Sequence, residues 1–128
     1  DDPRYFTAVE EKRLAAEAAH RAVERMKREF TVRLRSAVSR LDLAWQELAL
    51  ADETVAVLDR RLAVLETRVN LGEARRLDLA KDMNEAQAKR LERLTGRLGY
   101  ARAAGELERL LGLPADALGL VQKAPELP

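Results

Sequence analysis

The sequence predicts an all-α protein folded as a long antiparallel helical hairpin or coiled coil. No proline interrupts the chain between Pro3 and Pro114, and the first glycine is Gly72, inside a short break. On both sides of that break, apolar residues recur at alternating steps of three and four, the repeat of a coiled coil. We expect one hairpin over residues 1–128: one very long helix at 3–70, a tip turn at 70–75, a shorter return helix at 75–111, and a partly disordered tail at 112–128.

Helix-start signals open the first segment. Asp2 supplies an N-cap carboxylate, and Pro3 follows at the first helical position, where a missing N–H costs nothing. Beyond this start, Met26, Phe30 and Leu34 are spaced four and four, a stutter that relaxes a supercoil and leaves helix continuity through 26–34 open. From there, five heptads keep an apolar seam: Leu34, Ala37, Leu41, Ala44, Leu48, Ala51, Val55, Leu58, Leu62, Leu65 and Val69.

A second apolar line on the same helix recurs every seven residues. Leu43, Leu50, Val57 and Val64 make this line, which a simple two-stranded coil does not need. Its exact recurrence favours burial against a further neighbour, as in a bundle or a ring of staves. The alternative is that these are ordinary surface apolar residues.

The return helix is less regular, but its end is well marked. Gly112 followed two residues later by Pro114 predicts a helix stop. Its apolar positions include Leu77, Ala80, Met83, Leu91, Leu94, Leu98, Ala101, Ala104, Leu107 and Leu111. The stretch around Asn84 and Gln87 is more polar, so we expect that part of the seam to be weaker or to face water.

Composition excludes several classes of function. The net charge of +1 gives no global attraction to nucleic acid, and no apolar run reaches membrane-helix length, so we expect no nucleic-acid binding and no membrane contact by this segment. His20 stands alone without cysteine, so we expect no metal site. Ser36 and Ser39 have no histidine base in reach, so we expect no enzyme, no catalytic residue and no cofactor. The chain begins without Met, which we interpret as a mature or excised segment.

The run from Arg68 to Leu79, at the reversal, resembles a signature of the TolC-like outer membrane factor family. In that family a long helix ends in Arg or Tyr, a spacer and Gly, and the return helix opens with an apolar–Asp–apolar step, here Leu77-Asp78-Leu79. The run from Leu107 to Gly112 resembles its closing Leu-x-x-Ala-Leu-Gly, at the family's interval from the tip glycine. The chain departs from the family at Ala74, where Thr or Ser is frequent.

The resemblance implies a pair of staves in a periplasmic α-barrel, belonging to a homotrimeric outer membrane protein of a Gram-negative cell. It implies a role in tripartite efflux or type I secretion, with a periplasmic adaptor docked at the tip and an inner-membrane pump as further partner. The residues implied for docking are Arg68, Asn70, Leu71, Gly72, Arg75 and Arg76, and Asp78 is implied to line the aperture.

Two alternatives stay open on sequence grounds. One is the coiled-coil hairpin of an adaptor (membrane fusion) protein, and the other is a generic coiled-coil dimerisation or scaffold module. By either reading, Leu71 is an apolar residue at an exposed apex, which favours a docking role. We also expect the chain to self-associate through the seam of residues 16–34, which no second helix within the chain covers.

Overall fold

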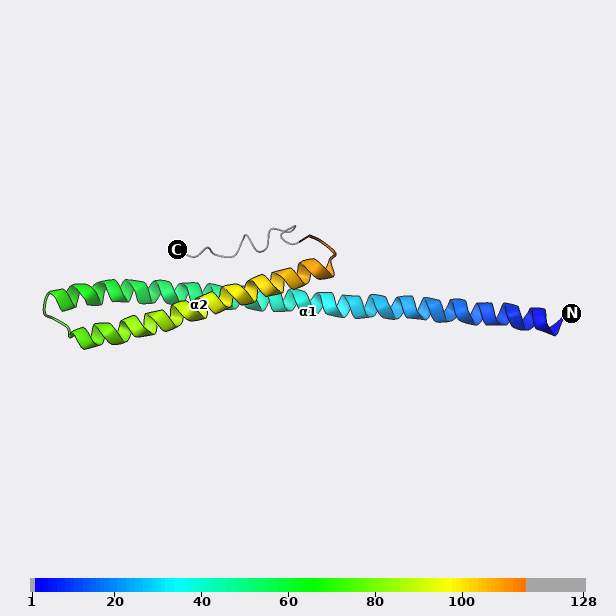
Figure 1. Ribbon diagram of the computed structural model, residues 1–128, viewed down its shortest axis with the longest axis horizontal. Coiled ribbons are helices and arrows are strands. Elements are labelled where there is room, and N and C mark those ends of the chain that lie inside the picture. The colour runs from blue at the N-terminus through cyan, green and yellow to red at the C-terminus, as the bar shows by residue number, and fades with distance from the viewer. Residues whose placement is uncertain (1, 115–128) are drawn as a thin grey trace. The chain divides into compact units, whose positions relative to one another are not determined.

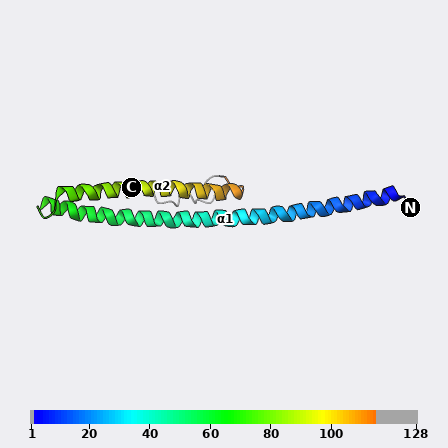
Figure 2. The same ribbon diagram turned by 90° about the horizontal axis from the view of Figure 1, so that it is seen from below.

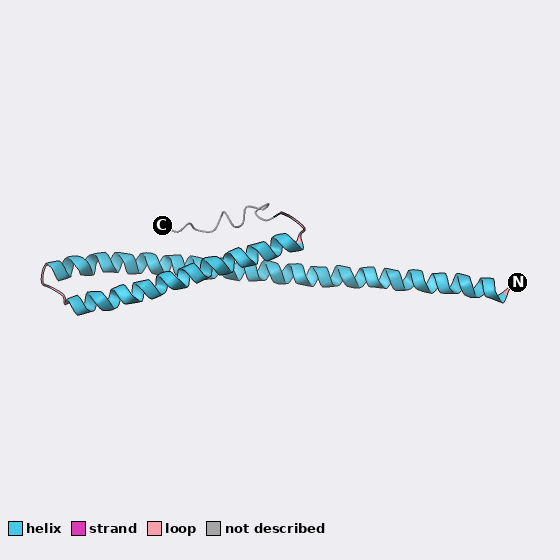
Figure 3. Cartoon of the chain, viewed as in Figure 1, coloured by secondary structure: helices cyan, strands magenta, loops and turns pink. Residues whose placement is uncertain are grey.

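The computed structural model describes residues 2–114, and these form two helices joined by one turn. Helix α1 spans Pro3–Asn70 and α2 spans Arg76–Leu110, and the described residues contain no strand (Figure 3). The predicted all-α hairpin is therefore confirmed, with helix ends within one residue of those expected. Of the predicted tail, only residues 112–114 fall within the described range. The described residues divide into two units, 2–36 and 37–114, which are taken separately below.

The first unit is a helical segment with an exposed surface. The backbone N–H of Arg4 donates to the Asp2 carboxylate at 2.9 Å, which confirms Asp2 and Pro3 as the start of α1. Among residues 2–36 none is buried, and the predicted seam positions Met26 and Phe30 are 58 % and 43 % exposed. Helix α1 is unbroken through 26–34, so the stutter does not interrupt it.

The second unit contains the hairpin. Helix α2 lies alongside the C-terminal half of α1 in two perpendicular views (Figures 1 and 2). The predicted α1 seam faces α2: Ala37, Leu48, Val55 and Leu58 are buried, and each other seam position from 41 to 69 is partly buried. A regular apolar face on α1 is thus what holds α2 in place.

The face that α2 turns toward α1 differs from the one expected. The seam residues predicted from its apolar pattern are largely outside, since Leu77, Leu91 and Leu98 are 57 %, 64 % and 49 % exposed. The buried positions of α2 are instead Ala86, Tyr100, Ala103, Ala104, Leu107 and Glu108. Between Arg76 and Gly99 the inner face also carries charged side chains, so the expectation of an apolar α2 seam was wrong for that stretch.

Small residues and one aromatic pair close the end of the hairpin far from the turn. The rings of Trp45 and Tyr100 lie 5.4 Å apart between centroids, tilted by 55°. Tyr100 is only 4 % exposed, and this burial raises the pKa of its phenol. Gly96 lies against Leu48, whose Cδ1 would be 3.6 Å from an added Cβ. The backbone of α2 at Gly96 therefore packs directly against Leu48 of α1.

Candidate functional site

The turn between the helices is a complete glycine C-cap. Gly72 has φ +75°, so this residue adopts the left-handed conformation that its position predicts. The Gly72 N–H donates to the Val69 carbonyl at 3.0 Å, and the Glu73 N–H donates to the Arg68 carbonyl at 2.8 Å. These two bonds are those of a Schellman motif and satisfy carbonyls that the last turn of α1 leaves open. The reversal is therefore fixed by backbone geometry.

The same motif ends α2. Gly112 has φ +68°. Its N–H donates to the backbone carbonyl of Arg109, and the Leu113 N–H donates to the backbone carbonyl of Glu108. The two glycines that the sequence analysis placed at the helix ends thus perform the same structural task.

Side chains around the turn form an apolar spot with a cationic rim. Leu71 is 68 % exposed, in agreement with the expectation that it buries nothing within the hairpin. Asn70 and the three arginines implied for docking, Arg68, Arg75 and Arg76, are also exposed. The turn brings the implied docking residues together because they lie at the adjoining ends of α1 and α2.

Asp78 lies in the first turn of α2 and pairs with a turn residue. The Arg75 Nε is 3.4 Å from its carboxylate, with the two side chains 80 % and 41 % exposed. A carboxylate there also interacts favourably with the helix dipole. Both roles are local, and a role in lining an aperture remains a prediction.

A series of ion pairs also joins the two helices, and the apolar repeats of the sequence did not predict it. Asp59 accepts a hydrogen bond from Arg90 at 2.6 Å, and Asp52 lies 4.0 Å from Arg93 and 3.9 Å from Arg97. The further pairs are Arg61 with Asp82 and Arg40 with Glu106. The sequence did contain a signal for these ion pairs, because the two residues of each pair lie at similar distances along the chain before and after Gly72.

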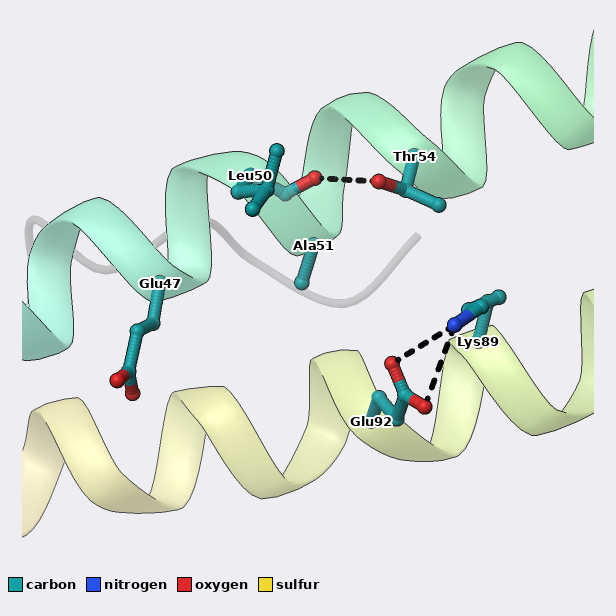
Figure 4. A pocket seen from close by; sticks show the side chains of 6 residues that line it. All are labelled: Glu47, Leu50, Ala51, Thr54, Lys89 and Glu92. Carbon is teal, nitrogen blue, oxygen red and sulfur yellow. Dashed lines mark hydrogen bonds and ion pairs between the residues drawn. The ribbon is translucent and has the colours of Figure 1, made fainter.

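A groove between the helices has no ligand-binding character. It is lined by Glu47, Leu50, Ala51, Thr54, Lys89 and Glu92 (Figure 4). Its hydrogen bonds stay within one helix: Thr54 donates to the Leu50 carbonyl at 2.9 Å, and Lys89 contacts Glu92 at 3.4 Å. No set of polar groups converges there on a common point, which a small-molecule site requires.

The described residues offer no centre for metal chemistry or membrane insertion. Within residues 2–114 no group of three or more His, Cys, Asp or Glu side chains is placed to hold a metal ion. Over the same range, neither helix combines the length and the apolar character that crossing a bilayer requires. No family model, curated protein or solved structure matches this chain. The turn, with its exposed leucine and arginines, is therefore the candidate site.

Proposed function

We propose that this chain forms part of the periplasmic helical tunnel of an outer membrane channel protein used in tripartite efflux or type I secretion. In this proposal the hairpin turn docks a periplasmic adaptor protein. The full-length protein is a homotrimer in the outer membrane of a Gram-negative cell and works with an inner-membrane pump.

The observation that carries the proposal is the outward apolar face of α2. Leu91, Leu94 and Leu98 are 64 %, 45 % and 49 % exposed, although α1 lies directly alongside their helix. Meanwhile the inner face of the same stretch carries Arg93 and Arg97. A helix with its large apolar side chains turned away from its hairpin partner requires a neighbour on its other side. Staves in a ring have a neighbour on each side, whereas a lone two-helix module does not.

The turn supports the docking part of the proposal. Leu71 supplies exposed apolar area at the apex, and exposed arginines surround it. The buried core of a protein interface is more apolar than the surrounding surface, and arginine is enriched at interfaces. Because the backbone of the turn is fixed by hydrogen bonds, these side chains meet a partner with little ordering cost.

The proposal is tested by export from cells that carry the full-length gene. Leu71→Ser, and separately the double change Arg75→Glu with Arg76→Glu, should each reduce export at least about tenfold through lost docking contacts. The matched control is Glu73→Ser, which changes an exposed turn residue outside the proposed surface. Helicity and protein level should stay unchanged in all three variants, because none of these side chains is buried in the hairpin.

Two outcomes would contradict the proposal. Full export in both docking variants, at normal protein level, would move the partner surface away from the turn. Recovery of the full-length protein outside the outer membrane fraction would instead favour an adaptor hairpin or a generic coiled-coil module.

A further inference from the structure

An exposed apolar line runs along α1 beside the seam that α2 covers, and two of its members, Leu43 and Leu50, also border grooves between the helices. Leu43, Leu50, Val57 and Val64 are 56 %, 65 %, 48 % and 61 % exposed, and Leu71 continues the same seven-residue spacing at 68 %. We call these five residues the outer line. A strict seven-residue repeat keeps them on one stripe of the helix, as a contact with a second helix requires.

Four charged residues flank the outer line without an ion pair inside the described hairpin: Glu47, Glu53, Arg60 and Arg68. Their neighbours Arg40, Asp52, Asp59 and Arg61 are all paired with α2. The helical repeat places Glu47 and Arg68 on one flank of the line and Glu53 and Arg60 on the other. On each flank the acid comes first along the chain and the base second.

We propose that the outer line binds the outer line of a second copy of this chain, antiparallel, with the two-fold axis at Val57. This register places Leu50 against Val64 of the second copy and Leu43 against Leu71. On both flanks, the acidic residues of one copy then lie against basic residues of the other. An antiparallel two-fold pair brings each flank against the same flank of the second copy, so Glu53 meets Arg60 and Glu47 meets Arg68.

Charge complementarity selects this arrangement over the parallel one. The antiparallel register forms four acid–base pairs between the two copies, two on each flank. It brings no like charges together between residues 43 and 70. A parallel pair instead brings one flank against the other. Arg60 would then lie beside Arg61 of the second copy, and no acid would face a base. Like-charge juxtaposition of this kind disfavours a partner arrangement.

This inference does not rest on the proposed function, because it concerns α1 of two copies and needs no adaptor, pump or membrane. A homotrimeric tunnel holds its hairpins parallel, so the antiparallel pair is a state of the chain outside that assembly. Leu71 and Arg68 belong both to the outer line and to the turn. The tests therefore use Glu53, Arg60 and the central apolar positions, which lie away from the turn.

The first test is charge reversal, read by sedimentation equilibrium of the full chain. Glu53→Arg alone and Arg60→Glu alone should each weaken self-association about tenfold, since two attractive pairs become repulsive. The double variant Glu53→Arg with Arg60→Glu restores opposite charges and should recover the original affinity within about threefold. An equimolar mixture of the two single variants should also recover it, by forming mixed dimers.

The control is Glu66→Arg, which reverses another exposed α1 charge that does not flank the outer line. Its self-association should match that of the unchanged chain. Absence of self-association, single variants with unaltered affinity, or a double variant as weak as the singles would each overturn the proposal. The sequence alone placed self-association in residues 16–34, so Phe30→Glu with Leu34→Glu distinguishes the two surfaces. An intact dimer in this variant supports the outer line, whereas loss of association there alone would place the contact in residues 16–34 and overturn the proposal.

The second test fixes the direction of the two helices by disulfide trapping, which is clean because the chain has no cysteine. Val57→Cys lies on the two-fold axis and should cross-link to itself under oxidation. Leu50→Cys alone should not cross-link, but should do so when mixed with Val64→Cys. Self-cross-linking of Leu50→Cys as efficient as that of Val57→Cys would show a parallel pair and overturn the proposal.

Discussion

The two halves of the hairpin are held together by different interactions. Near the turn, α2 buries only Ala86 and otherwise meets α1 through partly exposed charged side chains, as in the pairs of Arg61 with Asp82 and Asp59 with Arg90. Far from the turn it meets α1 through Tyr100, Ala103, Ala104 and Leu107, all of which are buried. The boundary lies close to Gly96, where the helices come into contact through Leu48.

Because the α1 seam is apolar along its whole length, this difference originates in α2. Val55 and Leu58, in the near half, are as well buried as Ala37 and Leu48 in the far half. What changes is the residue that α2 presents, since Leu77, Leu91 and Leu94 in its near half are exposed. Exposed ion pairs contribute about 0–1 kcal/mol each, whereas a buried aromatic side chain contributes several times more. The far half should therefore supply most of the stability of the hairpin.

The largest expected effect is at Tyr100. Tyr100→Ala removes a 4 %-exposed ring and its contact with Trp45, and should cost about 3 kcal/mol of unfolding free energy. The measurement is thermal unfolding followed by circular dichroism at a fixed low concentration. The matched control is Leu98→Ala two residues away, where the side chain is 49 % exposed and the loss should be well under half as large. Equal losses at both positions would show that the far half is not the apolar core.

A smaller effect is expected at Asp52, in the charged half. Asp52→Ala removes a carboxylate that lies 4.0 Å from Arg93 and 3.9 Å from Arg97, whose side chains are only 13 % and 11 % exposed. Because the pairing distances are long and Asp52 itself is 28 % exposed, we expect a loss of about 1 kcal/mol. That loss should shrink as salt is added, since salt screens partly exposed pairs. Glu66→Ala is the control, and a larger, salt-independent loss at Asp52 would show that the near half is not held by electrostatics.

Much of the fold could be predicted from the sequence because the signals that mark its helix ends are local. Each helix end is marked by a backbone requirement that does not depend on the partner helix. The residues that mark these ends are Asp2 and Pro3 at the start of α1, Gly72 at the turn, and Gly112 and Pro114 after α2. The α1 seam was also readable, since eleven positions from 34 to 69 follow one repeat without a polar residue.

The inner face of α2 could not be predicted by the same route. An apolar stripe shows that a helix packs against a partner, but it does not show which of several neighbouring helices packs against that stripe. Leu91 and Leu98 suggested an inner seam, and they lie outside because the hairpin register places Arg93, Gly96 and Tyr100 against α1. Counting residues from Gly72 would have found that register, since Trp45 lies 27 residues before it and Tyr100 lies 28 after it.

The candidate site was predictable in its position and exposure, but not in its role. Gly72 and Leu71 have the conformation and exposure that the sequence implied. A docking role depends on a partner surface, and no property of the turn alone specifies one. The docking residues and Asp78 as an aperture residue therefore stay predictions.

The smallest expected effect tests the far half through pH. Burial raises the pKa of Tyr100 above its ordinary value of about 10, so the folded hairpin favours the neutral phenol. The resulting contribution to stability is full below pH 10 and is lost as pH rises through the raised pKa. Tyr100→Phe keeps the ring but cannot ionise, so it should show less alkaline unfolding than the unchanged chain, in helicity measured from pH 8 to 12. Tyr5→Phe, at a side chain that is 73 % exposed, should unfold as the unchanged chain does. If Tyr100→Phe also retains the full alkaline transition, the phenol is not buried in solution, and the contrast between an apolar far half and a charged near half fails at its central residue.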